Sequence, residues 1–342
     1  MRAVRLEAIG KLHLREVATP VPGPDDLLVR VEACGVCGTD RHLLLGEFPS
    51  TPPVTLGHEF CGIVEAVGAD VSGIEPGMRI TGDPNISCGR CDQCVAGRIN
   101  LCRRLEALGI QRDGGFADRV LVPQRQAYVL PDNLPGTHGA FTEPLACCLH
   151  GIDLAAIRPG ASVVVLGGGV IGLLVVQLAK LAGAAEIVLS TRQASRRALA
   201  ERLGATRTVD PSAQDPVVAI AGAGGLLPGG ADVVIECAGV AATVEQSVRL
   251  ARSGGTVVIL GVMPQGETVR IEPFDILFRE LKVLGSFVNP FTHRRAADLI
   301  ARGAIAVEPL ISRTVGLDGA VSVIENPPAP GDVRVLVVPG GA

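Results

Sequence analysis

One stretch near the middle of the chain restricts its fold more than any other, because a buried strand, a glycine turn and a helix follow one another there. Ser162 to Leu166 is rich in β-branched residues, and the turn Gly167-Gly168-Gly169-Val170-Ile171-Gly172 follows it. Leu173 to Leu181 then resumes with helical periodicity. A strand that is apolar on both faces is typical of a parallel sheet covered by helices. The chain is therefore expected to contain an α/β domain.

The same region has to be weighed as a membrane segment, since Ala161 to Ala179 contains no charged residue and approaches the length of a bilayer-spanning helix. The glycines and the change from strand to helix periodicity favour a globular sheet instead. Short apolar runs continue to alternate with helical segments downstream, which indicates a Rossmann-type, doubly wound parallel sheet. Its expected strands are Val163 to Leu166, Ile187 to Leu189, Val233 to Glu236, Val257 to Leu260 and Val283 to Phe287.

The part of the chain before this sheet has a different character. Up to about Phe141 it is strand-like and often interrupted by Pro and Gly, which predicts a mainly β lobe with irregular loops. The last strand, Val333 to Val338, does not continue the α/β rhythm and is expected to return to the first lobe. The predicted domains are residues 1–143 together with 289–342, and residues 144–288.

Length and charge set the broad class of the protein. A chain of 342 residues with 47% hydrophobic content can form two domains with separate cores. A net charge of −4 gives no electrostatic reason to expect nucleic acid or an anionic membrane as a partner. The segment Met1 to Glu7 alternates charged and apolar residues and lacks the apolar core of a signal peptide. A cytoplasmic location is the expectation.

Four of the ten cysteines form a cluster with the spacing C-x2-C-x2-C-x7-C, which lets four thiolates bind one tetrahedral zinc with no open position. The alternative, a pair of disulfides, would need an oxidising compartment and is typical of short secreted chains. Residues 84 to 104 are rich in turn formers, so a metal is what could order them. The predicted structural-zinc ligands are Cys88, Cys91, Cys94 and Cys102.

The glycine turn also predicts a ligand. Gly167, Gly169 and Gly172 fit G-x-G-x-x-G at the end of a buried strand and the start of a helix, whose amides can bind a pyrophosphate. Alone, the triplet would be weak in a chain with 43 glycines, but here strand, turn and helix agree. We therefore expect a dinucleotide to bind at this turn, which includes Val170 and Ile171.

The second strand of the α/β sheet indicates which dinucleotide binds. About twenty residues after the glycine turn, an Asp or Glu normally binds the ribose 2′-hydroxyl. Here the strand ends in Ser190-Thr191-Arg192, with Arg196 and Arg197 beyond it. Hydroxyls and arginines could bind a 2′-phosphate, which a carboxylate would repel. NADP is therefore predicted over NAD, the alternative being that these arginines form a solvated helix face.

A second metal site is suggested by two short segments ahead of the cysteine cluster. Cys37 lies in Cys37-Gly38-Thr39-Asp40-Arg41-His42, and His58 lies in Gly57-His58-Glu59. Alone, each would more often be a buried cysteine or a hydrogen-bonded core histidine. Because the two segments flank one proline-rich loop, Cys37 and His58 are candidate ligands of a catalytic metal with an open position.

Together these motifs resemble the zinc-dependent medium-chain dehydrogenases/reductases, in particular the sorbitol (polyol) and threonine dehydrogenase branch. The resemblance covers essentially the whole chain and also includes Thr142-Glu143-Pro144-Leu145. It implies a GroES-like catalytic domain beside the nucleotide-binding domain, and Cys37, His58 and Glu143 as ligands of the catalytic zinc. Glu59 would lie beside that metal, and Cys147 and Cys148 are rival third ligands.

The resemblance also implies a mechanism. Zinc would bind the substrate hydroxyl and lower its pKa, and hydride would pass to the nicotinamide. Thr39 would take the hydroxyl proton and pass it through the cofactor ribose to His42, while Asp40 would orient His58. Cys237, Gly261 and Val262, at later strand ends, would line the nicotinamide.

The predicted activity is oxidation of a secondary alcohol, such as a polyol or sugar alcohol, by a homodimer or homotetramer that holds two zinc ions per chain and uses NADP. One alternative is a threonine or simple-alcohol dehydrogenase that uses NAD. Another is a catalytically silent nucleotide-binding relative, which the intact ligand set disfavours.

Overall fold

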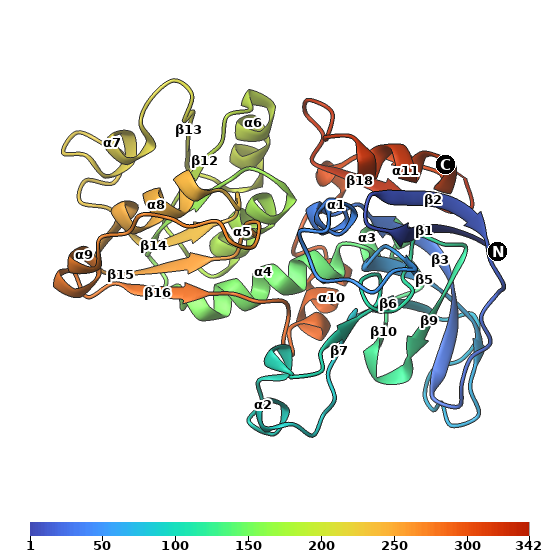
Figure 1. The fold of residues 1–342 in the computed structure, drawn as a ribbon. Helices are drawn as coiled ribbons and strands as arrows, with labels where there is room; N and C mark the ends of the chain where they lie inside the picture. The colour runs from blue at the N-terminus through green and yellow to red at the C-terminus, as the bar shows by residue number, and fades with distance from the viewer. Residues whose placement is uncertain (342) are drawn as a thin grey trace. The chain divides into compact units, whose positions relative to one another are not determined.

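The structure is a computed structural model that describes residues 1 to 341 (Figure 1). Its internal contacts divide the chain into two compact units. The first unit contains Met1–Ala146 and the segment from Val288 onward, and the second contains Cys147–Phe287. Within the described residues, no helix is both long and apolar enough to cross a membrane.

The second unit contains a six-stranded sheet in the order β13-β12-β11-β14-β15-β16, and every pair of neighbours is parallel. This order is characteristic of dinucleotide-binding sheets and confirms the predicted doubly wound α/β fold. The strands are β11 (Ser162–Leu166), β12 (Glu186–Ser190), β13 (Arg207–Val209), β14 (Ala231–Glu236), β15 (Ala251–Ile259) and β16 (Lys282–Gly285).

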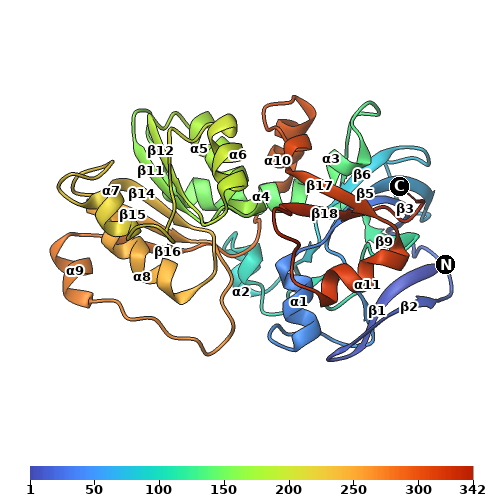
Figure 2. The ribbon, with the colours of Figure 1, turned by 90° about the horizontal axis from the view of Figure 1, so that it is seen from above.

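Helices cover both faces of this sheet, which explains why the middle of each central strand is apolar on both faces. Val163 to Leu166 of β11 are fully buried. Helices α5 and α6 lie on one face and α7 and α8 on the other (Figure 2). The sequence did not indicate β13, because three residues at a sheet edge are too short to show a period. The helices are α5 (Val170–Leu181), α6 (Ala194–Leu203), α7 (Pro216–Ala221), α8 (Ala241–Leu250) and α9 (Pro273–Phe278).

The first unit is mainly β. Its largest sheet runs β10-β6-β5-β3-β18-β17, with β9 also paired to β3, beside a three-stranded sheet β2-β1-β4 and a hairpin of β7 and β8. The strands are β1 (Arg2–Ala8), β2 (Lys11–Glu16), β3 (Asp26–Gly35), β4 (Val54–Thr55), β5 (Glu59–Val67), β6 (Arg79–Gly82), β7 (Asn85–Ile86), β8 (Glu106–Ala107), β9 (Arg119–Pro123), β10 (Ala127–Val129), β17 (Ile311–Val315) and β18 (Arg334–Val337).

Short helices connect these strands, and α4 runs across the division between the two units. They are α1 (Gly38–Leu45), α2 (Asp92–Val95), α3 (Gly136–Gly139), α4 (Thr142–Ala155), α10 (His293–Ala301) and α11 (Leu317–Glu325), with 3₁₀ turns η1 (Ile99–Leu101), η2 (Gln124–Gln126) and η3 (Glu308–Leu310).

Strand pairing in the first unit brings distant parts of the chain to one place. Gly35, at the end of β3, is opposite Glu59 of β5 on one side and Leu336 of β18 on the other. Strand β18 therefore belongs to the first unit, although about 270 residues separate it from β5. Phe60 and Phe116 are buried in the core beneath this region.

Candidate metal and cofactor sites

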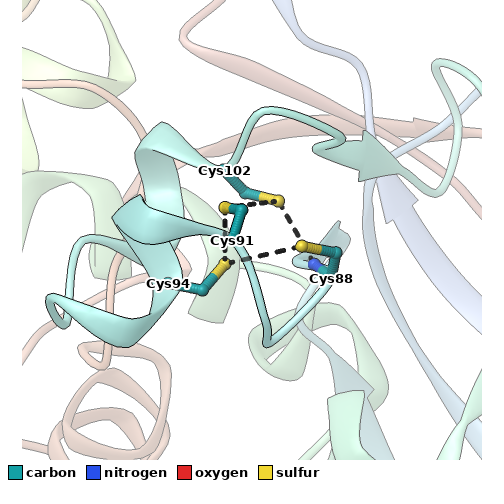
Figure 3. Close-up of side chains that lie close together, drawn as sticks. All are labelled: Cys88, Cys91, Cys94 and Cys102. Carbon is teal, nitrogen blue, oxygen red and sulfur yellow. Dashed lines mark hydrogen bonds between the residues drawn. The ribbon is translucent and has the colours of Figure 1, made fainter.

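The four clustered cysteines bring their sulfur atoms together (Figure 3). The Sγ atoms of Cys91 and Cys94 are 3.6 Å apart, and Cys88 to Cys94 and Cys91 to Cys102 are 4.0 Å apart. A tetrahedral zinc with Zn–S bonds of about 2.3 Å requires sulfurs about 3.8 Å apart. A disulfide would need about 2.05 Å. The geometry therefore fits one four-coordinate zinc ion and not a pair of disulfides.

Backbone amides favour the thiolate form, which zinc requires, at Cys88 and Cys91, whereas desolvation raises the pKa of the Cys94 thiol to about 11. Cys88 donates its N–H to Cys102 Sγ at 3.2 Å. The amides of Arg90 and Cys91 lower the pKa of the Cys88 thiol to about 5. The amide of Arg103 likewise lowers the pKa of Cys91. Because only short elements surround the cluster, bound metal would supply most of the order of the lobe.

A second group of possible ligand atoms lies where β3 leads into α1. The Cys37 sulfur, a ring nitrogen of His58 and a carboxylate oxygen of Glu59 all lie within 4.8 Å of one another. Cys37 is the N-cap of α1, and Glu59 begins β5. The side chains of His58 and Glu59 are buried. A thiolate, an imidazole and a carboxylate at this spacing form a donor set that fits zinc.

Asp40 supports this group from the first turn of α1. Its Oδ2 accepts the backbone N–H of Cys37 at 2.8 Å, and its Oδ1 lies 3.6 Å from His58 Nδ1. Burial alone would lower the pKa of His58, but Asp40 and Cys37 outweigh it and raise that pKa well above its usual value. His58 Nδ1 has no hydrogen-bond partner within residues 1–341, and Asp40 is placed to orient the ring.

Arg334 belongs to the same site, although it was not predicted from the sequence. Its guanidinium contacts the Glu59 carboxylate at 3.1 Å and donates to the Val36 carbonyl. The Arg334 side chain is 4% exposed and that of Glu59 is 2% exposed. One signal in the sequence could have indicated this residue, since an arginine begins an otherwise apolar strand. A charge buried with such a strand needs a partner of opposite charge.

The remaining expected catalytic residues also lie in the first unit. Glu143 is buried in the first turn of α4, but it is not one of the three residues whose ligand atoms lie within 4.8 Å. The Thr39 hydroxyl accepts from the Cys37 thiol at 3.7 Å. Nδ1 of His42, near the end of α1, lies 2.6 Å from the Glu47 carboxylate.

In the second unit, the glycine turn has the shape that its sequence requires. Gly167 has φ of +108°, and a Cβ on Gly172 would lie 1.9 Å from the Gly167 carbonyl oxygen. Gly169, the N-cap of α5, has open space where a Cβ would point. The N-terminal amides of α5 are thus free of side-chain cover and fit a pyrophosphate. The Cys148 thiol, a rival zinc ligand, donates to the Ile171 carbonyl at 3.6 Å.

The end of β12 lies directly beside this turn. Gly167 donates its N–H to the Ser190 carbonyl at 2.9 Å. A Cβ on Gly168 would lie 2.8 Å from the Thr191 side chain, so the two are in close contact. Arg192 is exposed, whereas Ser190 and Thr191 are buried. Hydroxyls and one exposed guanidinium therefore stand where a ribose-binding carboxylate is usual.

The other expected cofactor residues gather at the carboxyl ends of β14 and β15. Cys237 donates its N–H to the Leu166 carbonyl at 2.8 Å, and Gly261 donates to the Glu236 carbonyl at 3.0 Å. The fully buried Glu236 side chain also accepts N–H bonds from the turn that follows Cys237. Val262 is 52% exposed. The sequence predicted Glu236 only as the end of a strand, and the structure shows that its side chain also fixes the turn after β14.

Comparison with known proteins identifies the family. Residues 23–132 match the alcohol dehydrogenase GroES-like domain, and residues 170–302 match the zinc-binding dehydrogenase domain. Sorbitol dehydrogenase of Gallus gallus is 33% identical over 98% of this chain and 95% of its own length. The chain belongs to the zinc-type medium-chain dehydrogenases/reductases. The family and the class of enzyme, an alcohol oxidoreductase that depends on zinc, were both predicted from the sequence.

Two further relatives of this zinc-type dehydrogenase bear on its chemistry. A protein from Sinorhizobium meliloti 1021, assigned as a zinc-binding dehydrogenase, has a crystal structure with NADP bound. Its sequence is 70% identical to this chain, its structure matches with a TM-score of 0.98, and the match covers 99% of each chain. L-threonine 3-dehydrogenase of Alteromonas mediterranea is 31% identical over 92% of this chain and 92% of its own length.

Proposed function

We propose that this zinc-type dehydrogenase oxidises a secondary alcohol within a polyol or sugar alcohol and reduces NADP. The observation that carries the proposal is the Cys37, His58 and Glu59 group, because a site with one thiolate keeps a position for an alcohol oxygen. The similarity to sorbitol dehydrogenase favours a polyol as the substrate.

Two zinc ions per chain are part of this proposal. The four clustered cysteines would hold a structural ion, and Cys37, His58 and Glu143 would hold the catalytic one, with Glu59 beside it. The buried ion pair with Arg334 supports the secondary role of Glu59, since Arg334 already compensates that carboxylate. Glu143, in the first turn of α4, would be the third ligand, as the family resemblance implies.

The residues around the catalytic group would orient the substrate and move its proton. Bound zinc would supply Lewis acidity, and bound NADP would accept the hydride. Thr39, in hydrogen-bond contact with Cys37, would receive the proton of the substrate hydroxyl. His42, paired with Glu47, would release it toward solvent.

The preference for NADP rests on the end of β12. Ser190, Thr191 and Arg192 offer hydroxyls and a cation where NAD-binding sheets carry a carboxylate. The NADP-bound relative at 70% identity supports the same choice. Cys237, Gly261 and Val262, with the turn around Gly169, would complete the cofactor site.

The test is reduced-nicotinamide absorbance with polyols, hydroxy-amino acids and simple alcohols, each offered NADP and NAD. We expect turnover with polyols and NADP in zinc-loaded protein. Turnover of threonine with NAD would replace this proposal with the second candidate. The matched variant is Cys37→Ser, which should abolish turnover and reduce the zinc content from two ions to one while the fold is kept. Full activity in this variant would contradict the ligand assignment.

We also propose that the enzyme is a cytoplasmic homo-oligomer, either a dimer or a tetramer. None of the ten cysteines, all of which lie within the described residues, forms a disulfide, which suits a reducing compartment. Strand β16 is an edge of its sheet, and α9 next to it carries Phe274, Leu277 and Phe278, which are 59%, 77% and 76% exposed. An open edge with an apolar patch is typical of an interface. Light scattering should show a mass above the 35.3 kDa of one chain. Phe278→Glu should lower the measured mass toward that of a single chain.

A further inference from the structure

Arg197, on α6, is bound on several sides within the second unit. Its Nη1 donates to the carbonyl of Thr191 at 2.8 Å and to that of Arg192 at 2.7 Å. Its Nη2 forms an ion pair with Asp210 Oδ2 at 3.0 Å. One guanidinium thus connects α6, the turn after β12 and the end of β13.

Asp210, the partner of Arg197, is itself fixed by the chain around it. It follows β13 directly, and its Oδ1 accepts the backbone N–H of Ser212 at 2.9 Å. This hydrogen bond and the charge of Arg197 lower the pKa of Asp210, so the carboxylate is ionised at neutral pH. Thr191 donates its backbone N–H to the Val209 carbonyl at 3.1 Å. The turn after β12 is therefore tied to β13 by the backbone and by the Arg197 bridge.

Arg192 in this turn and Arg197 on α6 consequently differ in what they can offer an anion. The charge of Arg197 is compensated by Asp210, and its donors point at carbonyl oxygens. Arg192 is exposed, and the Thr191 side chain next to it packs against Gly168 of the phosphate-binding turn. An anionic ligand at the glycine turn would therefore meet Thr191, which packs against that turn, and Arg192, which is exposed to solvent.

We propose that Arg197 is a positioning residue for cofactor selection: it fixes the turn that presents Arg192 to the 2′-phosphate of NADP, and does not bind the phosphate itself. This inference rests on the proposed use of NADP. It gives Arg197 a role different from the direct contact expected from the sequence. Nη1 donates to two successive carbonyls while Nη2 pairs with Asp210. A guanidinium can divide these partners between two nitrogens, and an ammonium, with one nitrogen, cannot.

A double-mutant cycle between the two arginines tests the proposal. Dissociation constants for NADPH and NADH would be measured by cofactor fluorescence, which is convenient because the chain has no tryptophan. Arg192→Met should weaken NADPH about 10- to 100-fold, as expected for a lost charge-assisted hydrogen bond, and change NADH by less than about 3-fold. Arg197→Met should weaken NADPH by about 10-fold when Arg192 is present, but by less than about 2-fold in the Arg192→Met background.

The matched control is Arg202→Met, which removes the same charge from an exposed position in the last turn of α6 and should leave both constants unchanged. If Arg197→Met does not fold, Arg197→Lys takes its place in the same cycle. It should weaken NADPH binding less than Arg197→Met, and this effect should also disappear in the Arg192→Met background. Additive losses in the cycle would show direct phosphate binding by Arg197 and overturn the proposal. Equal weakening of NADPH and NADH would overturn it too. The unmodified enzyme separates a failure of this proposal from a failure of the NADP assignment. If the NADP assignment is wrong, the unmodified enzyme binds NADH as tightly as NADPH.

Discussion

The buried ion pair between Arg334 and Glu59 permits a quantitative prediction for Arg334→Met. Both side chains are almost fully buried, and Arg334 also donates to the Val36 carbonyl. Methionine has a similar length and is apolar, so the substitution removes the charge with little change in packing. It leaves the Glu59 carboxylate buried without its cation.

Breaking one side of a buried pair costs about 3–5 kcal/mol, because the remaining charge is uncompensated. The catalytic zinc would offset part of the Glu59 charge, so we expect the lower end, about 3 kcal/mol, in zinc-loaded protein. At about 2–4 °C per kcal/mol for a domain of this size, the melting temperature should fall by about 6–12 °C. Adding Glu59→Gln removes the second charge and should recover about half of the loss.

Thermal unfolding followed by circular dichroism would measure these shifts in the single variants and the double variant. The control is Arg313→Met, since Arg313 pairs with Asp332 at 3.3 Å but is 44% exposed and should contribute less than about 1 kcal/mol. Equal shifts for Arg334→Met and Arg313→Met would refute the reasoning. So would a double variant less stable than Arg334→Met alone.

Three further predictions concern the metal lobe, a buried acid and the glycine turn. Cys91→Ser should release one zinc per chain and make residues 88–102 the first site of proteolysis, measured by metal analysis and mass spectrometry; unchanged zinc content would contradict the four-cysteine site. Burial raises the pKa of Asp83 to about 6, so protonation of this carboxyl stabilises the folded state. This contribution to the free energy of unfolding is fully present below about pH 4 and is lost as pH rises through 6. Asp83→Asn should flatten this decline in urea unfolding between pH 4 and 7, and an unchanged slope would count against it. Gly169→Ala should weaken NADPH binding more than about 10-fold at unchanged stability. Gly172→Ala should also lower the melting temperature, because its Cβ would clash with the Gly167 carbonyl oxygen, whereas a Cβ on Gly169 would contact nothing.

Features that depend on neighbouring residues could be predicted from the sequence. The alternation of apolar runs and helical segments gave the order of strands and helices in the second unit, because burial on both faces leaves a continuous apolar signal. The spacing of Cys88 to Cys102 indicated converging sulfurs, since a short loop restricts where its side chains can point. Strand β13 was missed because three edge residues carry no period.

Contacts between distant segments were beyond such reasoning. Nothing near Arg334 in the sequence names Glu59 as its partner; the pairing of β18 and β5 on either side of β3 decides it. In the same way, Arg197 and Asp210 meet because α6 packs beside β13. The sequence indicated three arginines near a ribose, but not which of them is already neutralised by a carboxylate.

By itself, the sequence determined the family, the class of chemistry and the residue types at both candidate metal sites, because metal ligands and phosphate-binding turns impose local spacing that a single chain displays directly. Only the tertiary structure decided how charges are distributed among those residues. A charge acts over a few ångströms of space, and which groups share that space is set by strand register and helix packing. The pairs Glu59 with Arg334 and Arg197 with Asp210 are the products of that packing.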